Sequence, residues 1–359
     1  MQDVTCVVEK LVYGGKGLAH WNGEAVFIPF VVPGETIRAR LLSKRQKIWE
    51  AECLEVLEPA ADRVQAPCPY FGRCGGCQWQ HLSYESQLQW KQKIVAESLM
   101  RLGKIENPKV LPTLASPKIW GWRSRILVHG DGQGLVGFYE PDSRKVVDVE
   151  RCRIADDAVN AQLAGARKTL ATQKADLELR SDARQGFSQV NPGQNEQLKK
   201  LLQSLAGPLA HEHVVELFCG DGNFSRLFLD RARIFVGVDS SSVAIQHAIR
   251  TLAPLHPRNL AHFFCDDAAQ WWSRYQPQTP VDLLLLDPPR DGCAKMVEGV
   301  MKHRPKNILY ISCNPATLAR DLKFLKDFAG YSLVQTQPID MFPHSYHIES
   351  LSWISKETA

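Results

Sequence analysis

The residue best placed to do covalent chemistry is Cys313, which follows an apolar β-run. Residues 307–311 are rich in strand-forming types, and Pro315 prevents the strand from continuing. The thiol is therefore predicted at the C-terminal edge of a sheet, where open α/β folds place their chemistry. A helix predicted to begin near Thr317 would direct its positive end toward a nearby thiolate. A cysteine considered alone is more often a buried core residue.

Carboxylates end other apolar runs in the same half of the chain. Asp239 ends residues 234–239, Asp287 follows residues 282–286, and Asp267, with Asp266 as the alternative, follows a third run. Because parallel strands end at one edge of a sheet, these acids are expected to gather there. A carboxylate in the position of Asp239 can accept hydrogen bonds from ribose hydroxyls. Capping of a helix is the alternative role for each acid.

A glycine turn lies between a predicted strand and a predicted helix in residues 214–225. Gly220 and Gly222 allow a ligand to approach the backbone, and the turn lies at a helix N-terminus. A dinucleotide site would have a third glycine where Ser225 stands. The pattern therefore disfavours a nicotinamide cofactor.

A group of cysteines has the spacing of a metal site. Three of them lie within ten positions in a glycine-containing loop, at Cys68, Cys74 and Cys77. Gly75 and Gly76 let the backbone turn tightly enough to bring thiols together. A fourth thiol is needed to close the site, and Cys152 is the candidate. Thiolates suit iron–sulfur or zinc, and the spacing does not choose between them.

Composition sets the class of protein. The chain has 359 residues, 44% hydrophobic and 23% charged, which is ordinary for a globular protein. It has no apolar run of membrane-spanning length and no signal-peptide pattern at its start, so we expect a cytoplasmic protein without a membrane partner. Its 10 cysteines are expected to be reduced or metal-bound. A net charge of +4 permits a nucleic-acid partner.

The order of elements predicts three domains. Residues 1–58 read as short strands of a small barrel, residues 59–180 as a central domain with the cysteines, and residues 181–359 as the catalytic domain. Within the central domain we expect a helix over residues 84–100 and a strand pair over residues 125–129 and 135–139. Basic residues of the barrel that could contact phosphates are Arg38, Arg40, Lys44, Arg45 and Lys47. A solvated charged face is the alternative for each.

Several motifs together resemble one enzyme family over nearly the whole chain. They are Tyr-Gly-Gly-x-Gly-Leu-Ala at 13–19, Cys-x5-Cys-Gly-Gly-Cys-x-x-Gln-His at 68–81, Phe-x-Gln-x-Asn at 187–191, Asp-Pro-Pro-Arg at 287–290, Ser-Cys-Asn-Pro at 312–315 and the ending at 340–350. The first resembles the TRAM domain, an RNA-binding barrel. The set resembles the iron–sulfur branch of the RNA uracil-5 methyltransferases.

The resemblance implies a fold and a set of roles. The fold would be α/β, a Rossmann-like class I methyltransferase domain with an N-terminal OB-like TRAM barrel and a small α+β central iron–sulfur domain. Cys313 matches the nucleophile that adds to uracil C6, and Glu349 matches the base that removes the C5 proton. The implied contacts to S-adenosylmethionine are Gln189, Phe218, Gly220, Asn223, Asp239, Asp267 and Asp287. The implied ligands of a [4Fe-4S] cluster are Cys68, Cys74, Cys77 and Cys152. Asp239 stands where the family commonly has Glu.

The ending at 340–350, with the barrel and the cysteine spacing, resembles most the enzymes that modify 23S ribosomal RNA. Transfer RNA stays open as the substrate, and we expect a monomer.

Two other functional classes stay open for the chain, namely a non-catalytic iron–sulfur RNA-binding protein and a redox or dehydrogenase enzyme. A cytosine C5 methyltransferase is chemically closer to a uracil enzyme than either of these classes. Such an enzyme would be expected to place a carboxylate against cytosine N3 and its exocyclic amine, and no motif in this sequence specifies one. His344 and His347 are alternative bases or metal ligands.

Overall fold

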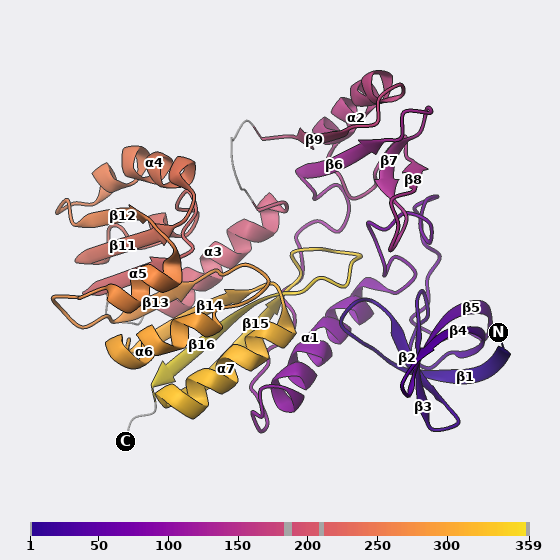
Figure 1. Ribbon diagram of the computed structural model, residues 1–359, viewed down its shortest axis with the longest axis horizontal. Helices are drawn as coiled ribbons and strands as arrows, with labels where there is room; N and C mark the ends of the chain where they lie inside the picture. Colours follow the sequence, from indigo (N-terminus) through magenta and orange to yellow (C-terminus); the bar gives the residue numbers. More distant parts are fainter. Residues whose placement is uncertain (1, 183–188, 208–211, 357–359) are drawn as a thin grey trace.

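The computed structural model describes residues 2–182, 189–207 and 212–356. Its strands form a closed barrel, a four-stranded sheet and a seven-stranded sheet, in the order of the chain (Figure 1). The barrel and the seven-stranded sheet lie at opposite ends of the view. In the described part of the chain, no helix has both the length and the apolar character needed to span a membrane. The N-terminal barrel and the Rossmann-like sheet predicted from the sequence are confirmed.

The barrel forms because its strands alternate apolar and polar residues. Val4, Cys6 and Val8 point inward from the first strand, while Asp3, Thr5 and Val7 between them are exposed. The strands close in the order β1-β2-β3-β5-β4. Their bounds are β1 Gln2–Leu11, β2 Gly17–Trp21, β3 Glu24–Ile28, β4 Thr36–Arg45 and β5 Ile48–Glu58.

The four-stranded sheet is antiparallel, in the order β8-β7-β6-β9, and carries one helix. Ile126 and Val128 of the sheet pack with Val159 and Leu163 of α2. The expected strand pair is confirmed as β6 and β7. The bounds are β6 Arg125–Gly130, β7 Val136–Tyr139, β8 Val146–Asp148, α2 Asp157–Leu170 and β9 Asp176–Arg180.

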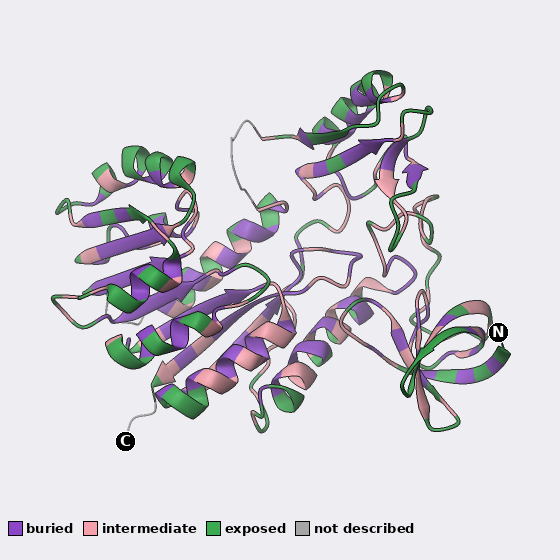
Figure 2. Cartoon of the chain, in the orientation of Figure 1, coloured by how far each residue is buried: buried purple, intermediate pink, exposed green. Residues whose placement is uncertain are grey.

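The seven-stranded sheet has the order β12-β11-β10-β13-β14-β16-β15. The first five strands in this order are parallel, and β16 runs antiparallel to its neighbours β14 and β15. Central strands such as β13 are apolar at every position because both faces are covered (Figure 2). The bounds are β10 His213–Leu217, β11 Ile234–Asp239, β12 Ala261–Cys265, β13 Leu283–Leu286, β14 Asn307–Ser312, β15 Tyr331–Ile339 and β16 Glu349–Lys356.

Helices cover both faces of this sheet. Side chains of α1, α5, α6 and α7 share one apolar core with the sheet, and those of α3 and α4 share a second. The bounds are α1 Tyr84–Arg101, α3 Pro192–Ala206, α4 Ser242–Thr251, α5 Ala268–Arg274, α6 Val297–His303 and α7 Pro315–Ala329. Short 3-10 turns lie at η1 Ser225–Leu227, η2 Ala253–Leu255 and η3 Ala294–Met296.

Helix α1 forms where the apolar periodicity predicts it, but it packs against the seven-stranded sheet and not against the four-stranded sheet. Ile94, Val95 and Leu99 join the core that α7 shares with the seven-stranded sheet. The chain after α1 then runs along β15, where Val110 pairs with Thr336. Residues 84–116 therefore pack with the seven-stranded sheet, although they come before the four-stranded sheet in sequence.

Candidate active site and cysteine-lined pocket

The loop that carries Cys313 joins β14 to α7. Asn314 caps the helix, its Oδ1 accepting a hydrogen bond from the Ala316 amide at 3.0 Å. Pro315 occupies the first position of the helix, where a missing N–H does no harm. The partly exposed Cys313 therefore lies between the end of a strand and the start of a helix, as the sequence predicts.

Glu349 is brought to the same place by strand register. Ser312 at the end of β14 pairs with Ser350 of the antiparallel β16. Continued by one position, this register brings Cys313 opposite Glu349, the first residue of β16, and the Glu349 charge acts on the Cys313 thiol. Residues directly opposite in an antiparallel pair have Cβ atoms about 5 Å apart. The two side chains named as nucleophile and base are thus neighbours, although 36 positions separate them in sequence.

Burial and charge make both groups difficult to ionise. Burial, followed by the charge of Glu349, raises the pKa of Cys313 to about 11, and Arg290 opposes the rise. Burial also raises the pKa of Glu349 well above its usual value, with Asp287 adding to the rise and Arg290 opposing it. Arg290 therefore provides the positive charge that helps either group to lose its proton. Its place in this site was not singled out from the sequence.

The glycine turn after β10 meets the end of β11 as predicted. The Gly220 amide donates to Asp239 Oδ2 at 2.9 Å, and the Ser241 amide donates to Asp239 Oδ1 at 2.8 Å. Phe218 and Gly220 both have positive φ, at 66° and 55°. A phenylalanine rarely adopts this conformation, so the turn holds Phe218 in a sparsely populated backbone state.

The other residues predicted to contact the methyl donor lie at the ends of neighbouring strands. Asp267 caps α5, its Oδ1 accepting the Gln270 amide at 2.9 Å, while Asp266 pairs with Arg274. Asp287 follows β13, and burial, followed by the charge of Asp239, raises its pKa to about 7. Asp239, Asp267 and Asp287 thus follow three strands of the sheet at its C-terminal edge.

The last two predicted contacts lie near the beginning of α3. Asn223 exchanges amide hydrogen bonds of 3.0 Å with Asn195 of α3. Gln189 is half-buried just before α3. Phe187, which opens the predicted signature around Gln189, lies outside the described residues.

Glu216 was missed in the sequence although it stands beside the glycine turn. It is fully buried, Ser225 Oγ donates to its Oε2 at 2.5 Å, and its Oε1 has no hydrogen-bond partner among the described residues. Burial, opposed by the Ser225 hydrogen bond, raises the pKa of Glu216 to about 8. The signal was visible as an acid within the apolar run 214–218.

The two histidines of the 340–350 segment are largely buried, and His344 is held by its neighbours. His344 stacks on Trp120 at 3.7 Å, and its backbone amide donates to Gln87 Oε1 at 2.9 Å. Burial lowers the pKa of His344 to about 3 and that of His347 to about 4. Groups with such low pKa values are weak bases.

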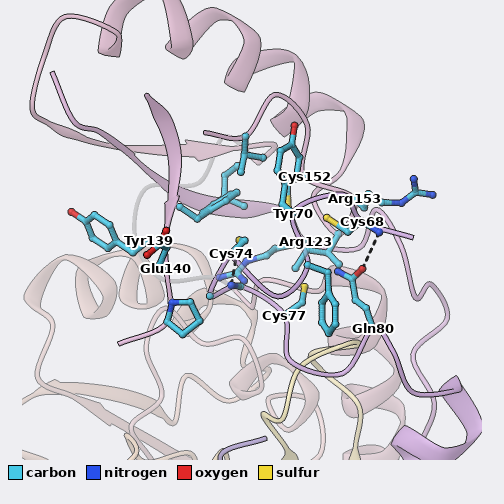
Figure 3. Close-up of a pocket in the computed structure, with 18 of the residues that line it drawn as sticks. Cys68, Tyr70, Cys74, Cys77, Gln80, Arg123, Tyr139, Glu140, Cys152 and Arg153 are labelled. Atoms are coloured by element: carbon cyan, nitrogen blue, oxygen red, sulfur yellow. Dashed lines mark hydrogen bonds between the residues drawn. The ribbon is translucent and has the colours of Figure 1, made fainter. Parts of the chain in front are cut away.

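The four predicted ligand cysteines line one pocket of about 380 Å³ (Figure 3). Cys68, Cys74 and Cys77 come from the loop before α1, and Cys152 comes from the loop before α2. Arg123 lies among them. In the part of the chain that the structure describes, no three His, Cys, Asp or Glu side chains form a site for a single metal ion.

The cysteine loop is held close to the four-stranded sheet by a glycine. The Gly75 amide donates to the Tyr139 carbonyl oxygen at 2.9 Å, and a Cβ on Gly75 would lie 3.0 Å from that oxygen. Burial is the main cause that raises the pKa of Cys74 to about 11 and that of Cys77 to about 12. Binding of a metal group would displace the protons of these thiols into solvent, because the ligand form is the thiolate. Four soft donors around one cavity fit such a group.

Comparison with known proteins shows the family to which the chain belongs. A family model described as tRNA (Uracil-5-)-methyltransferase matches residues 276–357, which include Cys313 and Glu349. A 23S rRNA (uracil(1939)-C(5))-methyltransferase RlmD of Azoarcus sp. strain BH72 is 31% identical, over 97% of this chain and 98% of that protein. The chain belongs to the RNA uracil-5 methyltransferase family. It is an RNA (uracil-5-)-methyltransferase by that membership.

Other relatives agree with this family. The protein of the same name from Nitrosococcus oceani is 30% identical, over 96% of this chain and 94% of its own length. The crystal structure of the Pyrococcus abyssi tRNA (uracil-54, C5)-methyltransferase in complex with S-adenosyl-L-homocysteine has a TM-score of 0.71 and covers 98% of this chain. All of that chain is covered in turn, at 22% identity, so the whole arrangement of the barrel and the two sheets is a methyltransferase fold.

The basic residues of the barrel are largely occupied with its own acids. Arg38 pairs with Glu55 at 2.9 Å, Arg40 with Asp3 at 2.9 Å and Lys44 with Glu24 at 2.7 Å. All three pairs lie on the surface, where an ion pair contributes little to stability. Exchanging the carboxylate partner of such a basic residue for an RNA phosphate would therefore cost little free energy. Arg45 and Lys47 are exposed at the turn between β4 and β5.

Proposed function

We propose that the chain uses Cys313 and Glu349 to methylate C5 of a uridine in RNA, with S-adenosylmethionine as the methyl donor. The observation that carries the proposal is the pairing of Ser312 with Ser350, which sets the two groups opposite each other at the end of the sheet. A thiol and a carboxyl in this arrangement can attack and deprotonate adjacent atoms of one flat ring. The methyltransferase fold and the family are shared with proteins that carry this activity in their names.

The reaction follows from the weak nucleophilicity of uracil C5. Addition of the Cys313 thiolate to C6 forms a carbon–sulfur bond and leaves an enolate, which makes C5 nucleophilic. C5 takes the methyl group as the bond from that methyl to the sulfonium breaks. Glu349 then removes the remaining proton from C5, and the electron pair expels the Cys313 sulfur to restore the C5–C6 double bond.

The raised pKa of Glu349 suits a base, whereas the raised pKa of Cys313 must be overcome to form the thiolate. A carboxylate with a raised pKa is a stronger base than an exposed one, so Glu349 gains driving force for taking the C5 proton. Arg290 opposes the rise in the pKa of Cys313 and so favours the thiolate that attacks C6. Asp287, which lies close enough to raise the pKa of Glu349, belongs to the same site.

The donor site is proposed at the adjoining strand ends. The glycine turn at Gly220 lets a ligand approach the backbone, and Asp239 retains acceptor capacity for ribose hydroxyls beyond its two amide partners. Asp267 would face the adenine end. The further contacts that we propose are Gln189, Phe218, Asn223 and Asp287.

For the substrate we propose 23S ribosomal RNA, with transfer RNA as the second candidate. The relatives from Azoarcus and Nitrosococcus, which match almost end to end, are named as 23S rRNA enzymes. The solved structure with the same fold is named as a tRNA enzyme, which keeps the second candidate open. A folded RNA must expose its uridine before Cys313 can reach C6.

We further propose a [4Fe-4S] cluster in the cysteine-lined pocket, held by Cys68, Cys74, Cys77 and Cys152. A pocket of about 380 Å³ is much larger than a single ion requires, since a water molecule takes about 30 Å³. The cluster would tie the loop before α1 to the loop before α2, and it has no part in the methyl transfer. Such a site belongs in the reducing cytoplasm.

The proposal is tested by trapping the adduct. Wild type, Cys313→Ala and the barrel control Cys53→Ala are incubated with S-adenosylmethionine and 5-fluorouridine-containing RNA, then run on a denaturing gel. Fluorine cannot leave C5 as a proton does, so wild type and Cys53→Ala should give a shifted band and Cys313→Ala none. Fragments of 23S RNA and transfer RNA run in parallel identify the substrate. No adduct with any RNA would overturn the mechanism.

A further inference from the structure

A residue of the N-terminal barrel touches the loop of the nucleophile. The hydroxyl of Tyr13 donates a hydrogen bond of 3.3 Å to the carbonyl oxygen of Cys313, across 300 positions of sequence. Tyr13 lies in the turn between β1 and β2 and is partly buried. Its hydroxyl is also close enough to Glu349 and Arg290 for their charges to act on it. The barrel therefore contributes a side chain to the surroundings of Cys313 and Glu349.

The nucleophile loop is held by a second hydroxyl as well. Ser350 Oγ, next to Glu349, donates to the Ser312 carbonyl oxygen at 3.3 Å. Two consecutive carbonyl groups, those of Ser312 and Cys313, thus accept hydrogen bonds from side chains on other elements. Together they hold the peptide planes on both sides of the Cys313 α-carbon, and so hold the direction in which its side chain leaves the backbone.

The turn that carries Tyr13 is itself firmly seated. The Tyr13 ring meets the Tyr346 ring edge-on at 5.6 Å between centroids. The indole of Trp79 donates to the Gly15 carbonyl oxygen at 3.1 Å. A Cβ on Gly15, whose φ is +90°, would lie 3.2 Å from the Tyr346 ring. The turn is thus held between Trp79, which lies just after the cysteine loop, and Tyr346, which lies in the segment that leads to Glu349.

We propose that Tyr13 is a positioning residue for Cys313, so that docking of the barrel completes the surroundings of the nucleophile. The hydrogen bond to the Cys313 carbonyl holds the thiol in line for attack on C6, and it draws electron density away from the peptide beside the sulfur. Both effects favour the reactive thiolate. The inference rests on the proposed function, because it assigns Tyr13 a role through the nucleophile.

The test removes only the hydroxyl. Tyr13→Phe keeps the ring against Tyr346. Its matched control is Tyr331→Phe, which removes the hydroxyl that donates to the Pro305 carbonyl oxygen at 2.5 Å, near the opposite end of β14. Full-length proteins, purified without oxygen, are compared for kcat and KM on RNA and for the melting temperature.

A readout without RNA isolates the thiol. Alkylation of Cys313 by iodoacetamide is followed by mass spectrometry over a range of pH, with the exposed Cys265 of the same molecule as the internal reference. Tyr13→Phe should slow both kcat and Cys313 alkylation by about three- to tenfold, the range of one lost hydrogen bond, with KM unchanged. Alkylation should also move to higher pH. Tyr331→Phe should change neither rate.

The outcomes separate this inference from the proposed function. A Tyr13→Phe protein with wild-type kcat and wild-type Cys313 alkylation overturns the positioning role. A raised KM with unchanged kcat also overturns it, since the hydroxyl would then bind RNA. If wild type gives no Cys313 adduct with RNA, yet Tyr13→Phe still slows alkylation of Cys313, the proposed function fails and the positioning role stands.

Discussion

Lys91 of α1 donates a hydrogen bond to Asp340 at 2.5 Å, and neither side chain has any exposed surface. The hydroxyl of Tyr84 donates to the other carboxylate oxygen at 2.7 Å, and Lys91 also donates to the Phe342 carbonyl oxygen at 3.0 Å. This buried ion pair fixes α1 to the beginning of the segment that ends in Glu349. The pair joins two parts of the chain that lie 249 positions apart, and the second of them leads to the proposed base.

Replacing Lys91 with Met should destabilise the protein strongly. The change leaves Asp340 buried without its cation, and the loss of one partner of a buried pair lowers the free energy of unfolding by about 3–5 kcal/mol. Arg101→Met on the same helix breaks the surface pair with Glu97 and should lower it by less than about 1 kcal/mol. Denaturant midpoints of the two variants measure the difference, and equal midpoints would contradict the account of Lys91.

Glu349→Gln should separate the two halves of the reaction. An amide cannot take the C5 proton, so methylated RNA should accumulate as a covalent adduct with Cys313 and be released at least about a hundredfold more slowly, as expected for loss of a general base. A denaturing gel with ordinary uridine RNA shows the accumulation. Rapid turnover by this variant would remove Glu349 from the role of base.

Glu216→Gln should flatten the dependence of stability on pH. The pKa of Glu216 is raised from 4.5 to about 8 in the fold, so the folded state binds more protons than the unfolded state between these values. Its contribution to stability therefore falls as pH rises from about 5 to about 8, by at most about 1.4 kcal/mol per pH unit.

Denaturation of wild type and Glu216→Gln at several pH values measures this slope. The exposed Glu298 supplies the control, and Glu298→Gln should keep the wild-type slope. A slope unchanged in Glu216→Gln would show that this carboxyl ionises in the folded protein as it does in the unfolded chain.

Loss of a cluster ligand should remove iron and sulfide together. Protein purified without oxygen should be brown and contain both elements, and Cys152→Ala should lose most of each, because three thiolates hold a four-iron cluster weakly. The barrel variant Cys53→Ala should keep the wild-type content. A colourless wild-type protein that binds zinc in place of iron would refute the cluster.

The sequence determined the local elements and the residue types at their ends. The short-strand pattern of residues 1–58 and the apolar run 307–311 predict strands that form, and the run 84–100 predicts a helix that forms as α1. These signals are legible because burial of one face imposes a fixed period on neighbouring residues. The thiols of Cys68, Cys74 and Cys77 could likewise be grouped, since a short loop brings them together.

Tertiary structure alone decided which distant residues meet. The register of β16 beside β14 sets Glu349 opposite Cys313, and periodicity contains no information on register between strands. Sequence order groups α1 with the cysteine domain, yet its apolar face packs on α7 because that face completes the core of the larger sheet. The contact of Tyr13 with Cys313 arises in the same way. A long-range contact depends on how whole elements dock, which no local pattern encodes.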